Sequence, residues 1–491
     1  MRKIAVVLAV LFCFLYADPP WTANVRVSTD QPWDSLNQGE SCFAIYGDTI
    51  VSICNTAERG DVPIAPYAYS FNGGQTFTSI PFTDNTTGIG WHTDPVIAFD
   101  DSGHVHMLIQ FSINMLKHYL SRDGGQTWSD TSVVWSSYGV DKPWMVVHNN
   151  EIYITWQQTS GSTGIIFAKS TDYGATWSTS NIWWRTGITA LCMDENENLH
   201  LCLVHWGAGA VYYRKSTDKG VTWSSETYLS SFDYSSSYGD RAPINSITAH
   251  GDIVFITWVS TLNNGSWDVM GIRSSDGGST WGSVFTVNDI TAGGQCKGWA
   301  HFDVYGGLHV TYIHSPSWPT NQNSLFELRY QYSSDSGLTF NPSIRVSDTS
   351  VKSLADFLGE YHVTASDSLY LYAIWPDGRN GDDNDLYFSK ALLSELSSAE
   401  QVAKSRTSAH LMESPTILSG IAYLQVDEYS RPVVIKAYDA VGRVIKELYT
   451  GRVNAPLKIT LNSTDFPMGV LFIKLSSGNY SEVKKVINIR S

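Results

Sequence analysis

Charged side chains recur at the entrances of successive short apolar stretches in this 491-residue chain. They are Glu40, His92 with Asp94, Asp141 with Lys142, Asp240 with Arg241, Lys297 and Glu360. Aromatic residues accompany them in neighbouring segments, namely Trp33, Trp91, Tyr138, Tyr234, Tyr238, Trp267 and Trp318. Aromatic faces beside hydrogen-bonding charges suit a sugar-binding surface, because sugar rings stack through their C–H faces. The alternative interpretation is that these positions are polar only because water reaches them.

These residues can act together only if a repeated element brings them to one place. Such a repeat is visible as eight-residue segments of the pattern S-x-[DN]-x-G-x-T-[WF]. The segments start at Ser70, Ser121, Ser170, Ser216, Ser274 and Ser333, at intervals of 51, 49, 46, 58 and 59 residues. Self-similarity sustained at such a period predicts a repeat architecture.

Each residue type in this pattern has a role in a tight turn. The Asp carboxylate, or the amide of Asn72 in the first segment, can accept the backbone N–H groups of its own turn. The Gly supplies a positive φ, and the final Trp or Phe is large enough to wedge between neighbouring sheets. We therefore expect these side chains to stabilise the fold and not to act as catalytic or calcium-binding groups.

The pattern resembles the Asp-box, or BNR repeat, of sialidase-like β-propellers, which implies an all-β fold over residues 18–394. Alternating and β-branched stretches between the boxes predict four strands in each unit. After the sixth box only three strands follow, and the missing fourth is expected at Asn24–Ser28, which resembles Ser343–Ser347. Closure by both chain ends leaves no free edge and predicts a seven-bladed β-propeller. Six blades with an appendage is the alternative.

A polar segment over residues 395–410 separates the propeller from a module of different composition, residues 411–491. Short alternating strands with Asp and Gly turns predict a small C-terminal β-sandwich there. Basic residues are frequent in this module, whereas the propeller is acidic, as expected for two separate domains.

Three features of this module resemble a known domain family. They are the segment Tyr438-Asp439-x-x-Gly442-Arg443, the strand from Gly469, and the ending that runs from Lys484-Lys485 to Arg490. This family is the type A C-terminal sorting domain of proteins exported by the type IX secretion system. It commonly has Leu and Tyr where this chain has Phe466 and Leu471. The resemblance implies that the type IX secretion machinery is a partner and that this module is a sorting signal without a catalytic role.

The N-terminus has the composition of a secretory signal peptide over residues 1–17. Arg2 and Lys3 precede the apolar run Ile4–Tyr16, and Ala17 follows it. No other apolar run is long enough to span a bilayer. We expect a monomeric protein, secreted or at the cell surface after export through the periplasm. The net charge of −15 argues against nucleic acid or an anionic membrane as the partner.

Sialidases hold the substrate carboxylate with three arginines and use a Tyr–Glu nucleophile pair with an Asp acid, so the resemblance implies candidates for these roles. Asp94 or Asp141 would be the acid. Tyr361 beside Glu360 would be the nucleophile pair, although adjacent residues of a strand point to opposite faces.

The family's Arg-Ile-Pro segment is absent from this chain, so Arg59, Arg241 and Arg379 are an arginine triad without a supporting motif. The full set of expected substrate-binding residues is Arg59, Trp91, His92, Lys142, Asp240, Arg241, Lys297 and Arg379. No cofactor is expected apart from Ca²⁺, for which Asp377, Asp382, Asp383 and Asp385 are weak candidates through their oxygen ligands. Their spacing is not that of an EF-hand loop, and Arg379 can instead neutralise Asp377.

Three functions remain open on this evidence. The leading hypothesis is that the protein recognises an extracellular or cell-surface glycan through a funnel on the face opposite the Asp-boxes. A glycoside hydrolase, exo-sialidase-like, or a lyase acting from the same funnel is the second. A non-catalytic scaffold that binds proteins is the third, because fold alone does not decide function.

Overall fold

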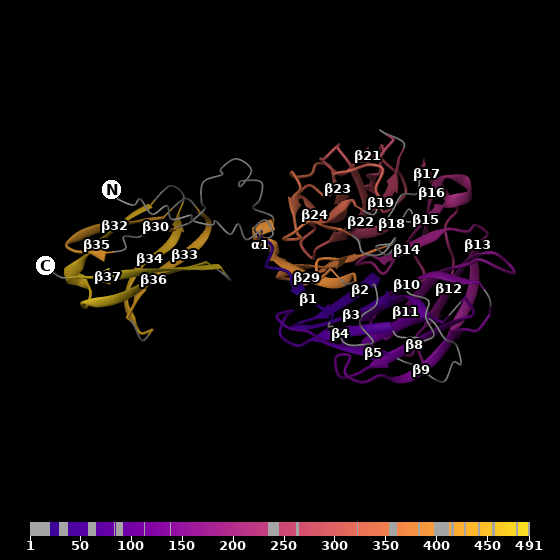
Figure 1. Ribbon diagram of the computed structural model, residues 1–491, viewed down its shortest axis with the longest axis horizontal. Helices are drawn as coiled ribbons and strands as arrows, with labels where there is room; N and C mark the ends of the chain where they lie inside the picture. The colour runs from indigo at the N-terminus through magenta and orange to yellow at the C-terminus, as the bar shows by residue number, and fades with distance from the viewer. Residues whose placement is uncertain are drawn as a thin grey trace, which may run out of the picture. The chain divides into compact units, whose positions relative to one another are not determined.

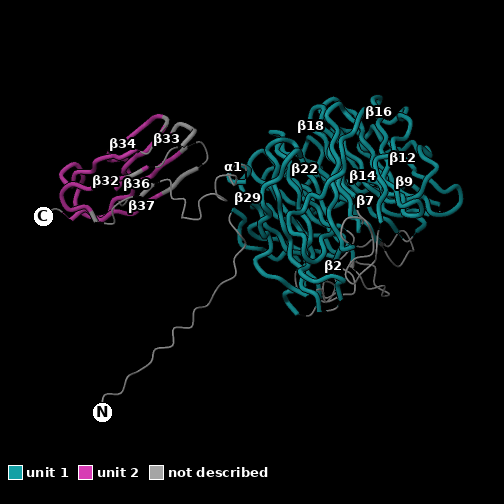
Figure 2. Tube along the Cα trace, turned by 90° about the horizontal axis from the view of Figure 1, so that it is seen from above, with its two compact units in different colours: residues 1–401 teal, residues 402–491 magenta. Residues whose placement is uncertain are grey.

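The protein is described here from a computed structural model, in which two compact units cover residues 1–401 and 402–491 (Figure 2). The structure describes residues 20–28, 38–56, 65–82, 84, 92–111, 113–137, 139–233, 245–261, 265–321, 323–352, 361–381, 383–396, 412–413, 417–426, 429–439, 442–453, 457–477 and 480–489. The predicted signal peptide and residues 397–410 of the predicted linker lie outside these ranges. Among the described residues, no helix is long and apolar enough to cross a membrane.

The described part of the first unit is nearly all β, in antiparallel sheets whose strands pair in chain order. The first sheet contains β2 (Gln38–Tyr46), β3 (Thr49–Thr56), β4 (Ala65–Ser70) and β5 (Thr78–Phe82). The second contains β6 (His92–Phe99), β7 (Val105–Phe111), β8 (Met115–Ser121) and β9 (Ser129–Trp135). The third contains β10 (Val140–His148), β11 (Glu151–Gln158), β12 (Gly164–Ser170) and β13 (Ser178–Trp183). The next two are β14 (Ile188–Met193), β15 (Leu199–His205), β16 (Ala210–Ser216) and β17 (Thr227–Ser231), with the 3₁₀ turn η1 (Trp206–Ala208); and β18 (Asn245–His250), β19 (Ile253–Ser260), β20 (Asp268–Ser274) and β21 (Phe285–Thr286).

Two further sheets complete the described part of this unit. One contains β22 (Gly294–Phe302), β23 (Leu308–Ser315), β24 (Leu325–Ser333) and β25 (Ile344–Arg345), with β26 (Val351–Lys352) also paired to β24. The other contains β27 (Val363–Ser366), β28 (Tyr370–Asp377), β29 (Asp385–Leu392) and the N-terminal β1 (Val25–Arg26), and is followed by the short helix α1 (Leu393–Leu396).

The first strands of these sheets line a common centre. Each contacts the next in chain order, from β2 through β6, β10, β14, β18 and β22 to β27, and β27 contacts β2 again. Figure 1 shows β2, β10, β14, β18 and β22 near this centre and β9, β13, β17 and β21 at the periphery. This radial arrangement of antiparallel sheets is that of a β-propeller.

The N-terminal segment pairs with the C-terminal part of the first unit, as the sequence predicts. Val25 lies opposite Phe388 of β29 and Arg26 opposite Tyr387. Arg26 also contacts the carboxylate of the buried Asp385 at 2.6 Å. The sheet that contains the last strands of the propeller is thus completed by its first.

The Asp-box turns have the predicted hydrogen bonds. In the second box, Asp123 Oδ1 accepts the Ser121 hydroxyl at 2.7 Å and the Thr127 N–H at 2.8 Å, while its Oδ2 accepts the Thr127 hydroxyl at 2.6 Å. The Ser121 oxygen in turn accepts the N–H of Gly125. The carboxylate is therefore committed to its own turn.

Box glycines and aromatic residues join each sheet to the preceding one. The box residue Trp281 packs on Tyr213 of β16, with ring centroids 4.8 Å apart, and Phe77 of the first box packs on Phe388 of β29 at 5.4 Å. Gly278 has φ +87°, and a Cβ there would lie 2.1 Å from the Tyr213 hydroxyl. Only glycine combines this conformation with this close approach.

The boxes lie at one end of the ring, here called the box end. Gly73 of the first box donates its N–H to the carbonyl of Asp48, and Gly277 of a later box donates to Asp252. Asp48 and Asp252 are in the turns that follow first strands, so the entrances to the first strands lie at the opposite end, here called the funnel end.

We expect Asp123→Ala to lower the free energy of unfolding by about 1–2 kcal/mol, because it removes the acceptor of three turn hydrogen bonds. Denaturant unfolding would measure this. Asp123→Asn is the matched control and should lose less, since Asn72 holds the Thr76 N–H in the first box at 3.0 Å. Unchanged stability in Asp123→Ala together with lost ligand binding would overturn the structural role.

We also expect stability to fall as the pH drops from about 6.5. Burial lowers the pKa of His301 to about 4, and burial with the nearby charge of Lys297 lowers that of His362 to about 3. The Thr280 hydroxyl and N–H and the Ser274 hydroxyl lower the pKa of Asp276 to about 2. All three groups bind fewer protons in the folded protein than in the unfolded chain, so acid favours unfolding.

The loss should come in two stages, between about pH 6.5 and 3 for the histidines and between about pH 4 and 2 for the aspartate. Urea unfolding at a series of pH values would measure it. A free energy of unfolding that stays constant from pH 7 to pH 3 would contradict this expectation.

The second unit has two sheets around one apolar core. Its described strands are β30 (Met412–Glu413), β32 (Ile421–Val426) and β35 (Leu457–Asn462) in one sheet, and β31 (Ile417–Leu418), β37 (Tyr480–Asn488), β36 (Gly469–Ser477), β33 (Tyr429–Tyr438) and β34 (Val444–Val453) in the other, with the 3₁₀ turn η2 (Ser463–Asp465). Leu424 from the first sheet and Ile435 and Ile473 from the second are buried in the same cluster.

Candidate functional site

Four of the predicted charged residues occupy the same structural position in four different sheets. Each lies in a β-bulge near the start of a first strand, with a positive φ: Glu40 (51°), Asp94 (48°), Lys142 (50°) and Lys297 (55°). A positive φ is costly for side chains of this kind, by roughly 1–2 kcal/mol. Bulges re-aim side chains, and strain repeated at one position makes these residues candidates for function.

Three of these residues meet at the centre of the ring. Lys142 Nζ lies 3.0 Å from a Glu40 oxygen and 2.6 Å from an Asp94 oxygen. Their side chains are only 11%, 3% and 2% exposed, respectively. Asn55 donates a further hydrogen bond to Glu40. Three of the predicted charged residues thus form one buried cluster, here called the axial cluster.

Tyr361 lies beside the axial cluster and is protonated there. Burial, together with the charges of Asp94 and Glu40, raises its pKa well above the ordinary value. Its hydroxyl donates to the carbonyl of Pro95 at 3.4 Å. This environment makes Tyr361 a hydrogen-bond donor and disfavours the phenolate that a nucleophile requires.

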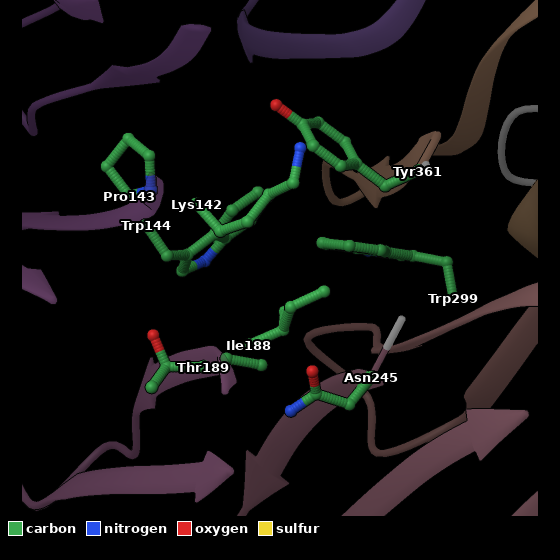
Figure 3. A pocket seen from close by; sticks show the side chains of 9 residues that line it. Lys142, Pro143, Trp144, Ile188, Thr189, Asn245, Trp299 and Tyr361 are labelled. Carbon is green, nitrogen blue, oxygen red and sulfur yellow. The ribbon is translucent and has the colours of Figure 1, made fainter. Parts of the chain in front are cut away.

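A pocket opens beside the axial cluster at the centre of the ring. It is lined by Lys142, Pro143, Trp144, Ile188, Thr189, Ala190, Asn245, Trp299 and Tyr361, which come from four sheets and, for Tyr361, from the segment before β27. Trp144 is the aromatic centre: its ring lies 5.0 Å from that of Trp299 and 6.1 Å, edge to face, from that of Tyr361. Figure 3 shows these rings pointing toward one another across the pocket.

Asn245 supplies an acceptor to this apolar pocket. The residue is 2% exposed, and its Nδ2 donates to the carbonyl of Cys202. Its Oδ1 is buried and accepts no hydrogen bond within the described part of the protein. An unsatisfied buried acceptor costs about 1–3 kcal/mol, so a ligand O–H or N–H at this position would be stabilising. The neighbouring Thr189 hydroxyl is shared with Thr155 at 3.1 Å.

Lys297, the fourth of these residues, lies near another buried group. It is 2% exposed, and its charge contributes to the low pKa of His362, which precedes β27. The His362 Nε2 is 2.9 Å from the Thr311 hydroxyl of the neighbouring β23. The fourth bulge therefore places Lys297 near the segment that leads into β27.

Other predicted site residues lie outside the axial cluster. Asp141 accepts a hydrogen bond from Gln157 at 2.9 Å. Arg379 binds Asp377 at 2.6 Å and also Asp348, and stacks on Tyr387. Burial lowers the pKa of Arg379, but its acidic partners outweigh burial and raise the pKa overall, so the guanidinium stays charged.

Two of the aromatic residues expected in the funnel pack on each other. Trp267 is only 1% exposed, and its ring lies 4.6 Å from that of Trp318. The expectation that Trp267 presents its face to a ligand is wrong, because Trp318 and the surrounding core enclose it.

The carboxylates proposed for Ca²⁺ already have protein partners. Asp377 is paired with Arg379, and Asp385 with Arg26 and the Ser28 hydroxyl. Asp383 is buried beside them, and Asp382 lies outside the described residues. In the part of the chain that the structure describes, no group of three or more His, Cys, Asp or Glu side chains is arranged to hold a metal ion.

Several predicted residues cannot be placed. The residues outside the described part of the chain are Arg59, Trp91, Asp240, Arg241 and Glu360. The side chain of His92 also lies outside it. Their roles stay predictions.

Sequence reasoning missed Trp299, Ile188, Thr189 and Asn245. A signal for Trp299 is present, because Lys297-Gly298-Trp299 repeats the spacing of Lys142-Pro143-Trp144. Asn245, in contrast, starts a first strand without a bulge or a charged neighbour in the described residues, and only the closed ring brings it to the pocket.

No family model matches the chain, and neither does any curated protein. Solved structures do match it. An α-L-arabinofuranosidase of family GH93 from Fusarium graminearum shares 13% identity over 76% of this chain and 99% of its own, with a TM-score of 0.42. A PL25 ulvan lyase shares 13% over 77% and 99%, with a TM-score of 0.49. NanB sialidase from Streptococcus pneumoniae shares 11% over 76% and 71%, with a TM-score of 0.41. These likenesses are too low to carry an activity.

Proposed function

We propose that this protein is a secreted, seven-bladed propeller of the sialidase superfamily that binds glycan at the funnel end of its ring. The observation that carries the proposal is the set of strained, charged bulges around an aromatic pocket with a buried unsatisfied acceptor. Such a combination of apolar faces and a few directed polar groups is what small-ligand sites share.

The chemistry of the pocket favours a sugar over an extended apolar ligand. Trp144 and Trp299 offer apolar contact surface for the substituent of a sugar, while Asn245 offers an acceptor for a hydroxyl or amide hydrogen. The pocket has a volume of about 20 Å³, which is room for about one water molecule. A sugar would therefore place one substituent in it and keep its ring outside.

Glycoside hydrolysis is the second candidate, and the axial cluster favours it. Most glycosidases use two carboxylates that face the same bond. Glu40 and Asp94 both contact Lys142, so two carboxylates lie close together at the centre of the ring. The protonated Tyr361 argues against the sialidase type of nucleophile.

A glycan array run beside reducing-sugar release on the same polysaccharides separates these functions. Binding without turnover supports recognition, and turnover supports a hydrolase. Binding to no glycan on the array would contradict the proposal and favour a protein-binding scaffold.

For the second unit we propose a small β-sandwich that acts as a type IX sorting domain on the exported chain. The test is to attach residues 411–491 to an unrelated periplasmic reporter in a host with type IX secretion. We expect the reporter to leave the periplasm. A reporter that stays there, in a host that exports the native protein, would identify the domain as an ordinary accessory module.

A further inference from the structure

Two exposed tryptophans lie at the funnel end, where the sheet of β10–β13 connects to the sheet of β14–β17. Trp184 follows β13 and is 74% exposed, the largest fraction of any aromatic residue that the structure describes. Trp206 opens the turn η1 after β15 and is 45% exposed. Exposed indole faces of this size call for an explanation.

The exposure of Trp184 is imposed by its neighbours. Trp183 Nε1 donates to Glu226 at 2.8 Å, and Arg185 binds the same carboxylate through two nitrogens at 2.7 and 2.6 Å. Arg185 also stacks on Tyr212 at 4.3 Å. Because alternate residues of an extended segment point to opposite sides, holding residues 183 and 185 inward turns Trp184 outward.

The two tryptophan segments leave the sheet side by side. Ile188 of β14 is paired with Val204 of β15, and a Cβ on Gly187 would lie within 3.0 Å of His205 Cα. Gly187 adopts φ +150°, which permits this approach. Trp184 precedes this crossing and Trp206 follows it, so their segments lie at the same end of two paired strands. We call these two residues, Trp184 with Trp206, the rim platform.

The chain leads within a few residues from the rim platform to the axial pocket. Ile188, Thr189 and Ala190, which line the pocket, follow Trp184 after only a few residues. Four extended residues span at most about 14 Å, so the backbone of Trp184 lies within oligosaccharide reach of the pocket. Next to Trp184 in the chain, Arg185 is neutralised by Glu226, which favours an uncharged partner.

On the basis of the proposed function, we infer that the ligand is a neutral oligosaccharide chain, one end of which reaches the axial pocket while its outer sugars stack on Trp184 and Trp206. The rim platform is then a second binding site, and the protein recognises an extended chain in preference to a single terminal sugar. Each sugar stacked on the rim adds affinity that a monosaccharide cannot obtain.

The test is calorimetric titration of the mature protein with cellohexaose, xylohexaose, mannohexaose and chitohexaose, and with the corresponding monosaccharides. At least one hexasaccharide should bind about tenfold or more tightly than its monosaccharide. Trp184→Ala should weaken that binding by about tenfold, as expected for one well-packed aromatic contact, and leave monosaccharide binding unchanged. Trp206→Ala should act in the same direction.

Tyr305→Ala is the matched control, because Tyr305 is 71% exposed but lies in a turn at the box end. It should bind the hexasaccharide like the native protein. If Trp184→Ala and Trp206→Ala both bind it normally, the rim platform is wrong while the axial site stands. Binding of no hexasaccharide would also overturn the inference, and the glycan array would then decide the proposed function separately. Changed self-association of Trp184→Ala without changed sugar binding would identify the rim as a contact between copies.

Discussion

A mature protein that lacks residues 18–30 should be less stable than the intact mature protein by about 5 kcal/mol or more. The deletion removes the buried side chains of Trp21 and Val27, each worth about 1.5–3 kcal/mol. It also removes Arg26, which pairs with the buried carboxylate of Asp385. Removing one partner of a buried ion pair lowers the free energy of unfolding by about 3–5 kcal/mol. These terms overlap, because the same strand makes both contacts.

Urea unfolding of the propeller would measure this effect, with the chain that starts at Asp18 as the reference. The single variant Arg26→Met is the matched partial change. It should lose less than the deletion, because the backbone bond from Val27 N–H to Leu386 at 2.8 Å remains. A deletion variant that unfolds like the reference would show that the N-terminal strand does not seal the ring.

Lys142→Met should have the second large effect, a loss of about 3–5 kcal/mol at neutral pH. The substitution keeps the length of the side chain but leaves Glu40 and Asp94 buried without the cation that contacts both. Urea unfolding of the variant and the native protein at pH 7 would measure this loss.

The chain offers a matched control at the box end. Lys219 also bridges two carboxylates, Glu151 at 2.7 Å and Glu197 at 3.0 Å, but its side chain is 32% exposed. Lys219→Met should therefore cost only about 1 kcal/mol or less, because exposed pairs are screened by water. Equal losses in the two variants would contradict the buried character of the axial cluster. The double variant Glu40→Gln with Lys142→Met should recover part of the stability.

The boxes could be predicted in detail because their chemistry is local. Ser121, Asp123 and Thr127 satisfy one another within a single turn, so their spacing in the sequence fixes their geometry. The pairing of Val25 with Phe388 could be predicted from the match between two distant strands that play equivalent roles.

The axial site could be predicted only in part. Glu40, Asp94 and Lys142 were visible because each enters a first strand. That Glu40 and Asp94 both reach Lys142 depends on bulges with positive φ, which sequence periodicity does not reveal. Asn245 was missed because its role arises from the pocket and not from its neighbours in the chain.

The affinity of Asn245→Ala for the strongest-binding glycan of the array tests the central claim most directly. Its weak bond to Cys202, at 3.4 Å, means that the variant should fold nearly normally. Asn150→Ala, at the box end, is the matched control. The account predicts that calorimetric titration finds binding about tenfold or more weaker in Asn245→Ala and unchanged in Asn150→Ala. Native affinity in a folded Asn245→Ala would contradict a glycan site at the centre of the ring.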